Sequence, residues 1–332
     1  MAVYKIFSEK DTFISSYRST QNFGRDEILE IANETTTTSV NADVTRALIQ
    51  FQTSQITNVI NNIISGSAYS SSLKLFLAEA TLPVDYTIYA YPLSQSWDMG
   101  LGKSSDFPIT TAGVTWGIQP GYYNSPSSSQ SFSYIDNKDI NMNITPIVSS
   151  WISSSNNGLI LKLSSSIENS DTPLITKFFS MDSHTIYPPQ LEFKWDDSSY
   201  SSSLTQVTSS DFISVISNNK SEFEENAIYT FKIKTRDIYP IRVFQTSSVY
   251  LNTKSLPSSS YWALKDVKTE EMVVDFDTNY TKISCNNISN YFKIYMDGLE
   301  PERYYQIIYK VVLSNGETVI VDNKSNYFKV VR

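Results

Sequence analysis

The sequence predicts an all-β protein made of two β-sandwiches, and two observations lead to this prediction. The 332 residues include 22 Tyr and 17 Phe, and Ser, Thr, Ile and Val are abundant. β-branched and aromatic side chains suit the pleated surface of a sheet better than a helix. Short runs of alternating apolar and polar residues are separated by polar loops. The chain is also long enough for two domains of about 150 residues each.

Residues 1–197 are expected to form an N-terminal β-sandwich with one or two short helices. Its candidate strands include RALIQF, SLKLFLAEA, YTIYAYPL and LILKLSS. A helix is expected in NITPIVSSWISSSNNG, where Thr145 can cap the first turn and Pro146 takes the first helical position. A second helix is expected in SQITNVINNIIS, directly after RALIQF, because its apolar residues recur at helical spacing.

A polar stretch, WDDSSYSSSLTQ, separates this part from the rest of the chain. It has almost no apolar side chain to bury, so residues 198–206 are expected to be a Ser-rich linker. Residues 207–332 then alternate again, with candidate strands that include AIYTFKIKTRD, IRVFQTSS and YYQIIYKVVL. About seven such strands predict an immunoglobulin-like or fibronectin-like sandwich. SNG at 314–316 is expected to be a hairpin turn.

Charge and composition exclude several classes of protein. The formal net charge is −8 and Lys and Arg do not cluster, so neither a nucleic acid nor an anionic membrane is expected as a partner. The single cysteine, Cys285, rules out an intramolecular disulfide. No run approaches the length of a membrane span, and the first residues lack the pattern of a signal peptide. We therefore expect no membrane insertion.

The chemistry-bearing residues argue against an enzyme. His184 is the only histidine, and it lies in a polar loop far along the chain from Cys285. A catalytic histidine needs an orienting partner and a nucleophile within reach. The spacing of a calcium-binding loop is absent, and GLG at 100–102 does not lead into the helix that a phosphate-binding loop needs. No catalytic, cofactor-binding or metal-binding residues are predicted.

Aromatic residues around one glycine-containing stretch, SQSWDMGLGKSSDFPITTAGVTW, form the first candidate site. Trp97, Asp98 and Trp116, with the nearby Tyr122 and Tyr123, are expected to contact a glycan or a protein partner. An alternative is that the tryptophans seal one end of the sandwich. A third alternative is a glycan-degrading enzyme that uses carboxylates such as Asp98.

The strand YYQIIYKVVL is the second candidate site. Tyr305, Ile307 and Tyr309 share one face, and Tyr304 lies on the other. Because both faces are apolar, this strand is predicted to lie in an interface with a neighbouring chain. The alternative is that both faces are buried within one chain.

The order of motifs in residues 1–197 resembles the DNRLRE-type jelly-roll family. DTFISSYRSTQNFGRDEILEIAN, RALIQFQTSQI, SQSWDMG with GVTWGIQP, ITPIVSSWISSSNNGLILKL and FFSMDSHTIYPPQLEFKW follow one another as the segments of that family do. The resemblance implies a jelly-roll sandwich, and some members of the family bind carbohydrate. The whole chain, including GLEPERYYQIIYKVVL, is similar to virion structural proteins of tailed bacteriophages, especially marine ones.

This resemblance implies a non-enzymatic structural protein of a virion, in the neck, tail, baseplate or a fibre. Its expected partners are other virion proteins and further copies of itself in a symmetric homo-oligomer. The alternative is a carbohydrate-binding module that recognises a host or environmental glycan, with Trp97, Trp116 and Tyr122 or Tyr123 as its stacking platform. No cofactor is expected in either case.

Overall fold

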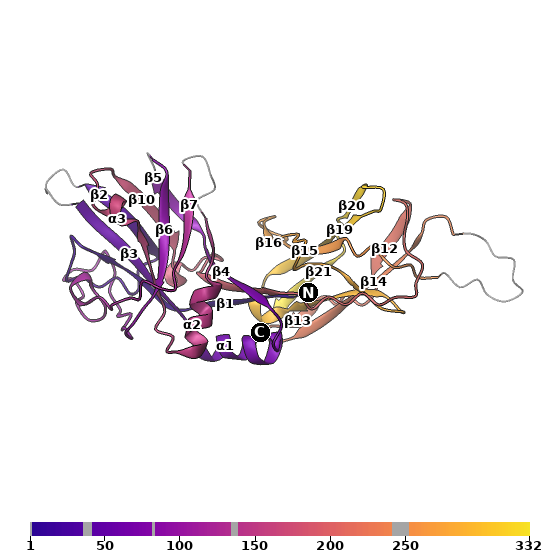
Figure 1. The fold of residues 1–332 in the computed structure, drawn as a ribbon, viewed down its shortest axis with the longest axis horizontal. Helices are drawn as coiled ribbons and strands as arrows, with labels where there is room; N and C mark the ends of the chain where they lie inside the picture. Colours follow the sequence, from indigo (N-terminus) through magenta and orange to yellow (C-terminus); the bar gives the residue numbers. More distant parts are fainter. Residues whose placement is uncertain (1, 36–41, 82–83, 134–138, 241–251) are drawn as a thin grey trace, which may run out of the picture. The chain divides into compact units, whose positions relative to one another are not determined.

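The computed structural model describes residues 2–35, 42–81, 84–133, 139–240 and 252–332 (Figure 1). Strands account for most of the regular structure and the helices are few and short, so the predicted all-β class is confirmed. The predicted strand IRVFQTSS lies outside the described residues. None of the helices in the described ranges is long and apolar enough to span a membrane.

The chain divides into two compact units. The N-terminal unit contains Lys5–Gly66 and Ser70–Phe193, and the C-terminal unit contains Met1–Tyr4, Ser67–Tyr69 and Lys194–Arg332. The start of the chain thus belongs to the C-terminal unit, where the hydroxyl of Tyr4 donates to Asp297 Oδ2 at 2.8 Å.

Among the described residues of the first part of the chain, eleven strands form one sheet. They are β1 (Ala2–Ser15), β2 (Ile28–Thr35), β3 (Ala42–Phe51), β4 (Tyr69–Leu75), β5 (Leu77–Thr81), β6 (Tyr86–Pro92), β7 (Ser128–Phe132), β8 (Ile140–Asn143), β9 (Leu159–Leu163), β10 (Leu174–Phe179) and β11 (Gln190–Trp195). Their main order is β5-β10-β2-β3-β1-β11-β4-β8, and β9 joins β3 to β6, which pairs with β7.

The register of this sheet decides which side chains share a face. Ala47 of β3 is paired with Leu161 of β9, and both are buried. Their neighbours Arg46 and Lys162 therefore lie on the opposite face of the sheet. Tyr89 of β6 is paired with Lys162, so its side chain lies on that same face.

Both predicted helices are present. They are α1 (Thr53–Asn58), which continues as the π-helix η1 (Val59–Ile64), and α2 (Thr145–Ser153). The residues of α2 at helical spacing, Ile147, Val148 and Trp151, are buried as their pattern predicts. The expected cap is wrong by one position, because Ile144 is the N-cap and Thr145 is the first helical residue. The Thr145 hydroxyl instead accepts a hydrogen bond from the backbone N–H of Ser71 at 2.8 Å.

Four further short helical turns lie within the described residues. They are α3 (Ser165–Glu168) and the 3-10 turns η2 (Trp116–Ile118), η3 (Met181–Ser183) and η4 (Met296–Gly298).

The described residues of the C-terminal unit form a sandwich of two sheets. Its strands are β12 (Phe212–Ile216), β13 (Glu222–Glu224), β14 (Ile228–Asp237), β15 (Ser260–Asp266), β16 (Met272–Val274), β17 (Ser284–Cys285), β18 (Asn290–Tyr295), β19 (Tyr304–Val312), β20 (Thr318–Val321) and β21 (Tyr327–Val331). One sheet has the order β12-β14-β18-β17 and the other β13-β21-β19-β15-β16, with β20 beside β19. The predicted turn at 314–316 joins β19 to β20, and Gly316 has a φ of 84° there.

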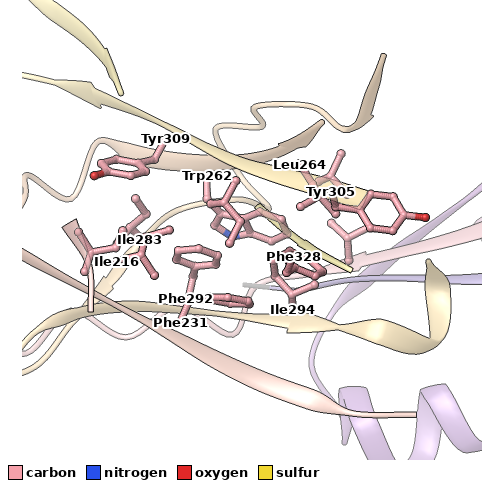
Figure 2. Packing of buried hydrophobic residues seen from close by; sticks show 14 of the residues in the cluster. Ile216, Phe231, Trp262, Leu264, Ile283, Phe292, Ile294, Tyr305, Tyr309 and Phe328 are labelled. Atoms are coloured by element: carbon pink, nitrogen blue, oxygen red, sulfur yellow. The ribbon is translucent and has the colours of Figure 1, made fainter. Parts of the chain in front are cut away.

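Aromatic side chains from both sheets fill the core of this unit (Figure 2). The Trp262 ring from one sheet is stacked on Phe292 from the other, with 5.2 Å between their centroids. The Phe231 and Phe328 rings are 5.7 Å apart across the same core. These contacts make the two sheets one sandwich, and its immunoglobulin-like topology stays a prediction.

Strand β19 supplies a large part of that core. Tyr305, Ile307 and Tyr309 are at most 2 % exposed, whereas Tyr304 on the opposite face is 40 % exposed. The first three residues therefore pack inside the chain, and Tyr304 is the member of the set that a neighbouring chain could reach. The role of this strand in an interface stays a prediction.

The polar segment expected to be a linker is hydrogen bonded to the C-terminal unit. The backbone N–H of Ser201 donates to the carbonyl of Cys285, and the N–H of Cys285 donates to the carbonyl of Ser199, each at 3.0 Å. The domain boundaries at 197 and 206 remain a prediction.

Candidate functional site

One buried amide organises the glycine-containing stretch between β6 and η2. The Asn22 side chain is fully buried, and its Nδ2 donates to the carbonyls of Met99 at 2.9 Å and Val114 at 2.8 Å. Its Oδ1 accepts from the backbone N–H groups of Gly24 at 3.1 Å and Gly102 at 2.9 Å. All four hydrogen-bonding positions of the amide are thereby used, which holds the two arms of the loop together.

Two glycines of this loop are needed because the backbone approaches Asn22 closely. A Cβ on Gly102 would lie 2.3 Å from the carbonyl oxygen of Asn22. A Cβ on Gly113, whose φ is 103°, would lie 2.6 Å from the Cα of Gly100. The concentration of glycines in this stretch therefore follows from packing around one amide.

Trp97 lies beneath this loop and is only 7 % exposed. Its Nε1 donates to the carbonyl of Asn157 at 2.9 Å. The ammonium of Lys10 lies 4.6 Å from its ring centroid and donates to its carbonyl at 2.7 Å. The ring packs in a small cluster with buried side chains that include Leu48 and Val114. Trp97 thus helps to hold the loop on the sheet.

A cavity of about 320 Å³ opens beside Trp97. It is lined by Gln95, Ser96, Trp97, Asp98, Gly113, Val114, Ile118, Gln119 and Pro120. The exposed Asp98 carboxylate accepts from the backbone N–H of Gly100 at 3.2 Å. The side chain of Ile118 is 74 % exposed. The cavity therefore offers a carboxylate, an amide and an apolar side chain to a small ligand.

Next to it, three partly exposed tyrosines form a row on the face of the sheet. This aromatic row consists of Tyr89 and Tyr91 of β6 and of Tyr122. Tyr122 pairs with Leu93, the residue after β6, in an isolated antiparallel β-bridge. The Tyr89 and Tyr91 ring centroids are 6.1 Å apart with an interplanar angle of 11°, and those of Tyr91 and Tyr122 are 5.2 Å apart at 33°. Burial raises the pKa of Tyr91 above its ordinary value, which already keeps a tyrosine hydroxyl protonated at neutral pH, so this hydroxyl can donate a hydrogen bond.

Three charged side chains lie on the same face and form the ion cluster, Arg46, Lys162 and Glu168. Arg46 is held by both carboxylate oxygens of Glu168, with Nε to Oε1 at 3.0 Å and Nη2 to Oε2 at 2.9 Å. The Lys162 ammonium lies 3.0 Å from the same Oε2. Their side chains are 16 %, 8 % and 7 % exposed for Arg46, Lys162 and Glu168. The charges therefore lie largely out of water.

The ion cluster contacts the surrounding aromatic rings. The Arg46 guanidinium lies 4.7 Å from the Trp116 ring centroid, and the Lys162 ammonium lies 5.8 Å from that of Tyr122. Arg46 Nη1 also donates to Oε1 of Gln119 at 3.4 Å, and Gln119 lines the cavity. The aromatic row, the ion cluster and the cavity are therefore adjacent parts of one surface within the N-terminal unit.

This surface brings together four of the five residues singled out in the first candidate site. Trp97 and Asp98 line the cavity, while Trp116 and Tyr122 contact the ion cluster. Tyr123 is 57 % exposed and follows Tyr122 in the chain. The contribution of these residues to binding stays a prediction.

The strand residues of the candidate site are absent from the sites predicted from the sequence. Tyr89 and Tyr91 could have been predicted to lie together, because the alternation in YTIYAYPL places both on one face of a strand. Arg46 and Lys162 were marked by being the charged residues of the apolar strands RALIQF and LILKL. Glu168 carried no signal, since only the fold brings it to both cations.

The remaining chemistry-bearing residues do not join this surface. His184 lies in an exposed turn with a φ of 52°, and Cys285 is buried in β17. Burial also raises the pKa of the Cys285 thiol, which lowers its reactivity. Among the described residues no three His, Cys, Asp or Glu side chains are grouped so that they could hold a metal ion.

Most of the N-terminal part of the chain matches a known protein family. The model of carbohydrate-binding module family 96 matches residues 2–194, which is more than half of the chain. The matched range contains the aromatic row, the ion cluster and the cavity. No curated protein matches the chain significantly.

Proposed function

The chain belongs to carbohydrate-binding module family 96 through residues 2–194, and we propose that it binds a carbohydrate on the surface formed by the aromatic row and the cavity. The observation that carries the proposal is the row itself, three neighbouring tyrosine rings that are partly exposed on one sheet face. Sugar rings have apolar C–H faces that pack on aromatic rings, and their hydroxyls form hydrogen bonds at the edges.

The polar groups around the row suit the edges of a sugar. The protonated hydroxyl of Tyr91 can donate to a sugar oxygen, and the exposed Asp98 carboxylate can accept from a sugar hydroxyl. Gln119 lines the cavity and its Oε1 accepts from Arg46, so its amide lies where the cavity meets the ion cluster. A ligand of more than one sugar unit fits this arrangement, with one unit on the row and another in the cavity.

Binding without turnover is the form of activity proposed. Stacking and hydrogen bonding need no nucleophile or general base, and among the described residues that line the cavity only Asp98 carries a carboxylate. A glycosidase requires two carboxyl groups on either side of the scissile bond. The virion role rests on the sequence resemblance alone, and the family match favours its carbohydrate-binding alternative.

A glycan array probed with the full chain tests this proposal, followed by calorimetry on any glycan that binds. We expect Tyr91→Ala to weaken binding by at least an order of magnitude, because truncating a central aromatic residue commonly costs about 2 kcal/mol or more. Tyr17→Ala is the matched control, since Tyr17 is 64 % exposed in the same unit but outside the row. Absence of binding to any glycan, or equal affinity of both variants, would overturn the proposal.

A further inference from the structure

The carboxylate of Glu168 is hydrogen bonded to the edge of the Arg46 guanidinium that is best suited to bind an anion. The Nε and Nη2 atoms of a guanidinium form a fork that matches a carboxylate, and in Arg46 both bind Glu168. Oε2 of Glu168 also holds the Lys162 ammonium. An acidic ligand would therefore have to compete with Glu168 for both cations.

The charge of the ion cluster depends on this one carboxylate. Arg46 and Lys162 contribute two positive charges and Glu168 one negative charge, so the cluster carries +1 with Glu168 and would carry +2 without it. Because these side chains are at most 16 % exposed, water screens them less than it screens surface charges. The two cations lie against Trp116 and Tyr122, so their charge acts on a ligand lying over those rings.

We propose that Glu168 sets the charge preference of the carbohydrate site, by lowering its affinity for carboxylated sugars relative to uncharged ones. The inference rests on the proposed function, since it assigns Glu168 a role in choosing among glycans. Glu168 does not itself contact the sugar in this proposal. It is a positioning residue, which affects specificity by holding Arg46 and Lys162 and offsetting part of their charge.

Two substitutions change the cluster charge in opposite directions. Glu168→Gln keeps the shape of the side chain and raises the charge by one. Lys162→Gln lowers it by one and leaves the paired bonds between Arg46 and Glu168 in place. Glu79→Gln is the control for total charge, because Glu79 is exposed and paired with Lys177 on β10, a strand separated from β3 by β2.

The measurement compares matched oligosaccharides by calorimetry at low salt, using the full chain. The pairs are β-linked glucose with β-linked glucuronate and α-linked galactose with α-linked galacturonate. We expect Glu168→Gln to raise the ratio of carboxylated to neutral affinity on the order of fivefold, and Lys162→Gln to lower it similarly. Glu79→Gln should leave the ratio unchanged.

The outcomes separate this inference from the proposed function. If the wild-type chain binds a glycan and the ratio is the same in Glu168→Gln and the wild type, the role of Glu168 is wrong while carbohydrate binding stands. If Glu168→Gln does not fold, Lys162→Gln decides alone, and an unchanged ratio there overturns the inference. Failure of the wild-type chain to bind any sugar counts against the proposed function and against this inference with it.

Discussion

The guanidinium of Arg46 lies 4.7 Å from the centroid of the Trp116 ring while both oxygens of Glu168 hold its other edge. A side chain on β3 is thus fixed between a loop and the helical turn α3. Both contacts are long-range in sequence, and they connect the sheet to the part of the loop that contains Trp116.

Replacing Arg46 should destabilise the N-terminal unit. In Arg46→Gln the Glu168 carboxylate keeps only Lys162 as a charged partner in the cluster, and we expect a loss of about 3 kcal/mol in the free energy of unfolding. Urea denaturation measures this loss. Arg25→Gln removes the same charge from an exposed position and should change stability by less than about 0.5 kcal/mol. Equal effects would show that the buried pair contributes nothing.

Replacing Asn22 should release the loop. Asn22→Ala leaves the carbonyls of Met99 and Val114 and two buried N–H groups without their partner, which should cost on the order of 3 kcal/mol. Hydrogen exchange of the Gly102 amide should also become faster. Asn62→Ala, at an exposed side chain hydrogen bonded to Asn58, serves as the control and should be close to neutral. Unchanged exchange at Gly102 would contradict the anchoring role.

Two glycines with similar φ angles allow the cost of steric crowding at a new Cβ to be measured apart from the cost of a positive φ. Gly113 and Gly66 have φ values of 103° and 84°, but a Cβ would clash only at Gly113, since nothing lies within 4 Å at Gly66. We expect Gly66→Ala to cost about 1 kcal/mol and Gly113→Ala clearly more, by thermal or urea unfolding. Similar losses would mean that the loop moves away from the new methyl group.

The buried Asp11 should make stability depend on pH. Burial raises the pKa of its carboxyl to about 7, despite hydrogen bonds from the Met181 N–H and the Ser8 hydroxyl. The unfolded value is about 4, so the native state retains a proton that the unfolded state has lost. The resulting stabilisation is full below about pH 4 and is lost as the pH rises through about 7.

Urea unfolding of the wild type and of Asp11→Asn between pH 4 and 8 checks this dependence. The free energy of unfolding of the wild type should fall relative to that of the variant as the pH rises, because asparagine does not titrate. Parallel profiles for the two proteins would show that Asp11 ionises in the native state as it does in the unfolded chain.

Local patterns in the sequence were sufficient for many elements of the fold, although SLKLFLAEA, predicted as one strand, is divided between β4 and β5, and β8 was not predicted. Alternation predicts strands such as β6, and the spacing of Ile147, Val148 and Trp151 predicts α2, because both depend only on neighbouring residues. The predicted N-cap of α2 was wrong by one residue, because the Thr145 hydroxyl accepts a hydrogen bond from the backbone N–H of Ser71, which lies far away in the sequence.

The site depends on pairings that no local pattern contains. Strand β9 lies between β3 and β6, so Lys162 is brought beside Tyr89 across more than seventy residues of chain. Glu168 follows β9 in the short turn α3 and reaches the cluster for the same reason. The indole of Trp97 is likewise held by Asn157, a contact set by the strand order rather than by its own neighbours.

The two halves of the proposed binding surface are supported by different parts of the fold. Tyr89 and Tyr91 belong to strand β6 of the sheet. The cavity is instead formed by a loop whose position depends on the hydrogen bonds of the Asn22 side-chain amide. Replacing that loop with one of another length, while keeping Asn22 and its glycine neighbours, would redesign the cavity and leave the tyrosines in position. The cavity loop and the tyrosines of the strand can therefore be changed independently, and directed evolution could vary the loop while the tyrosines keep their positions.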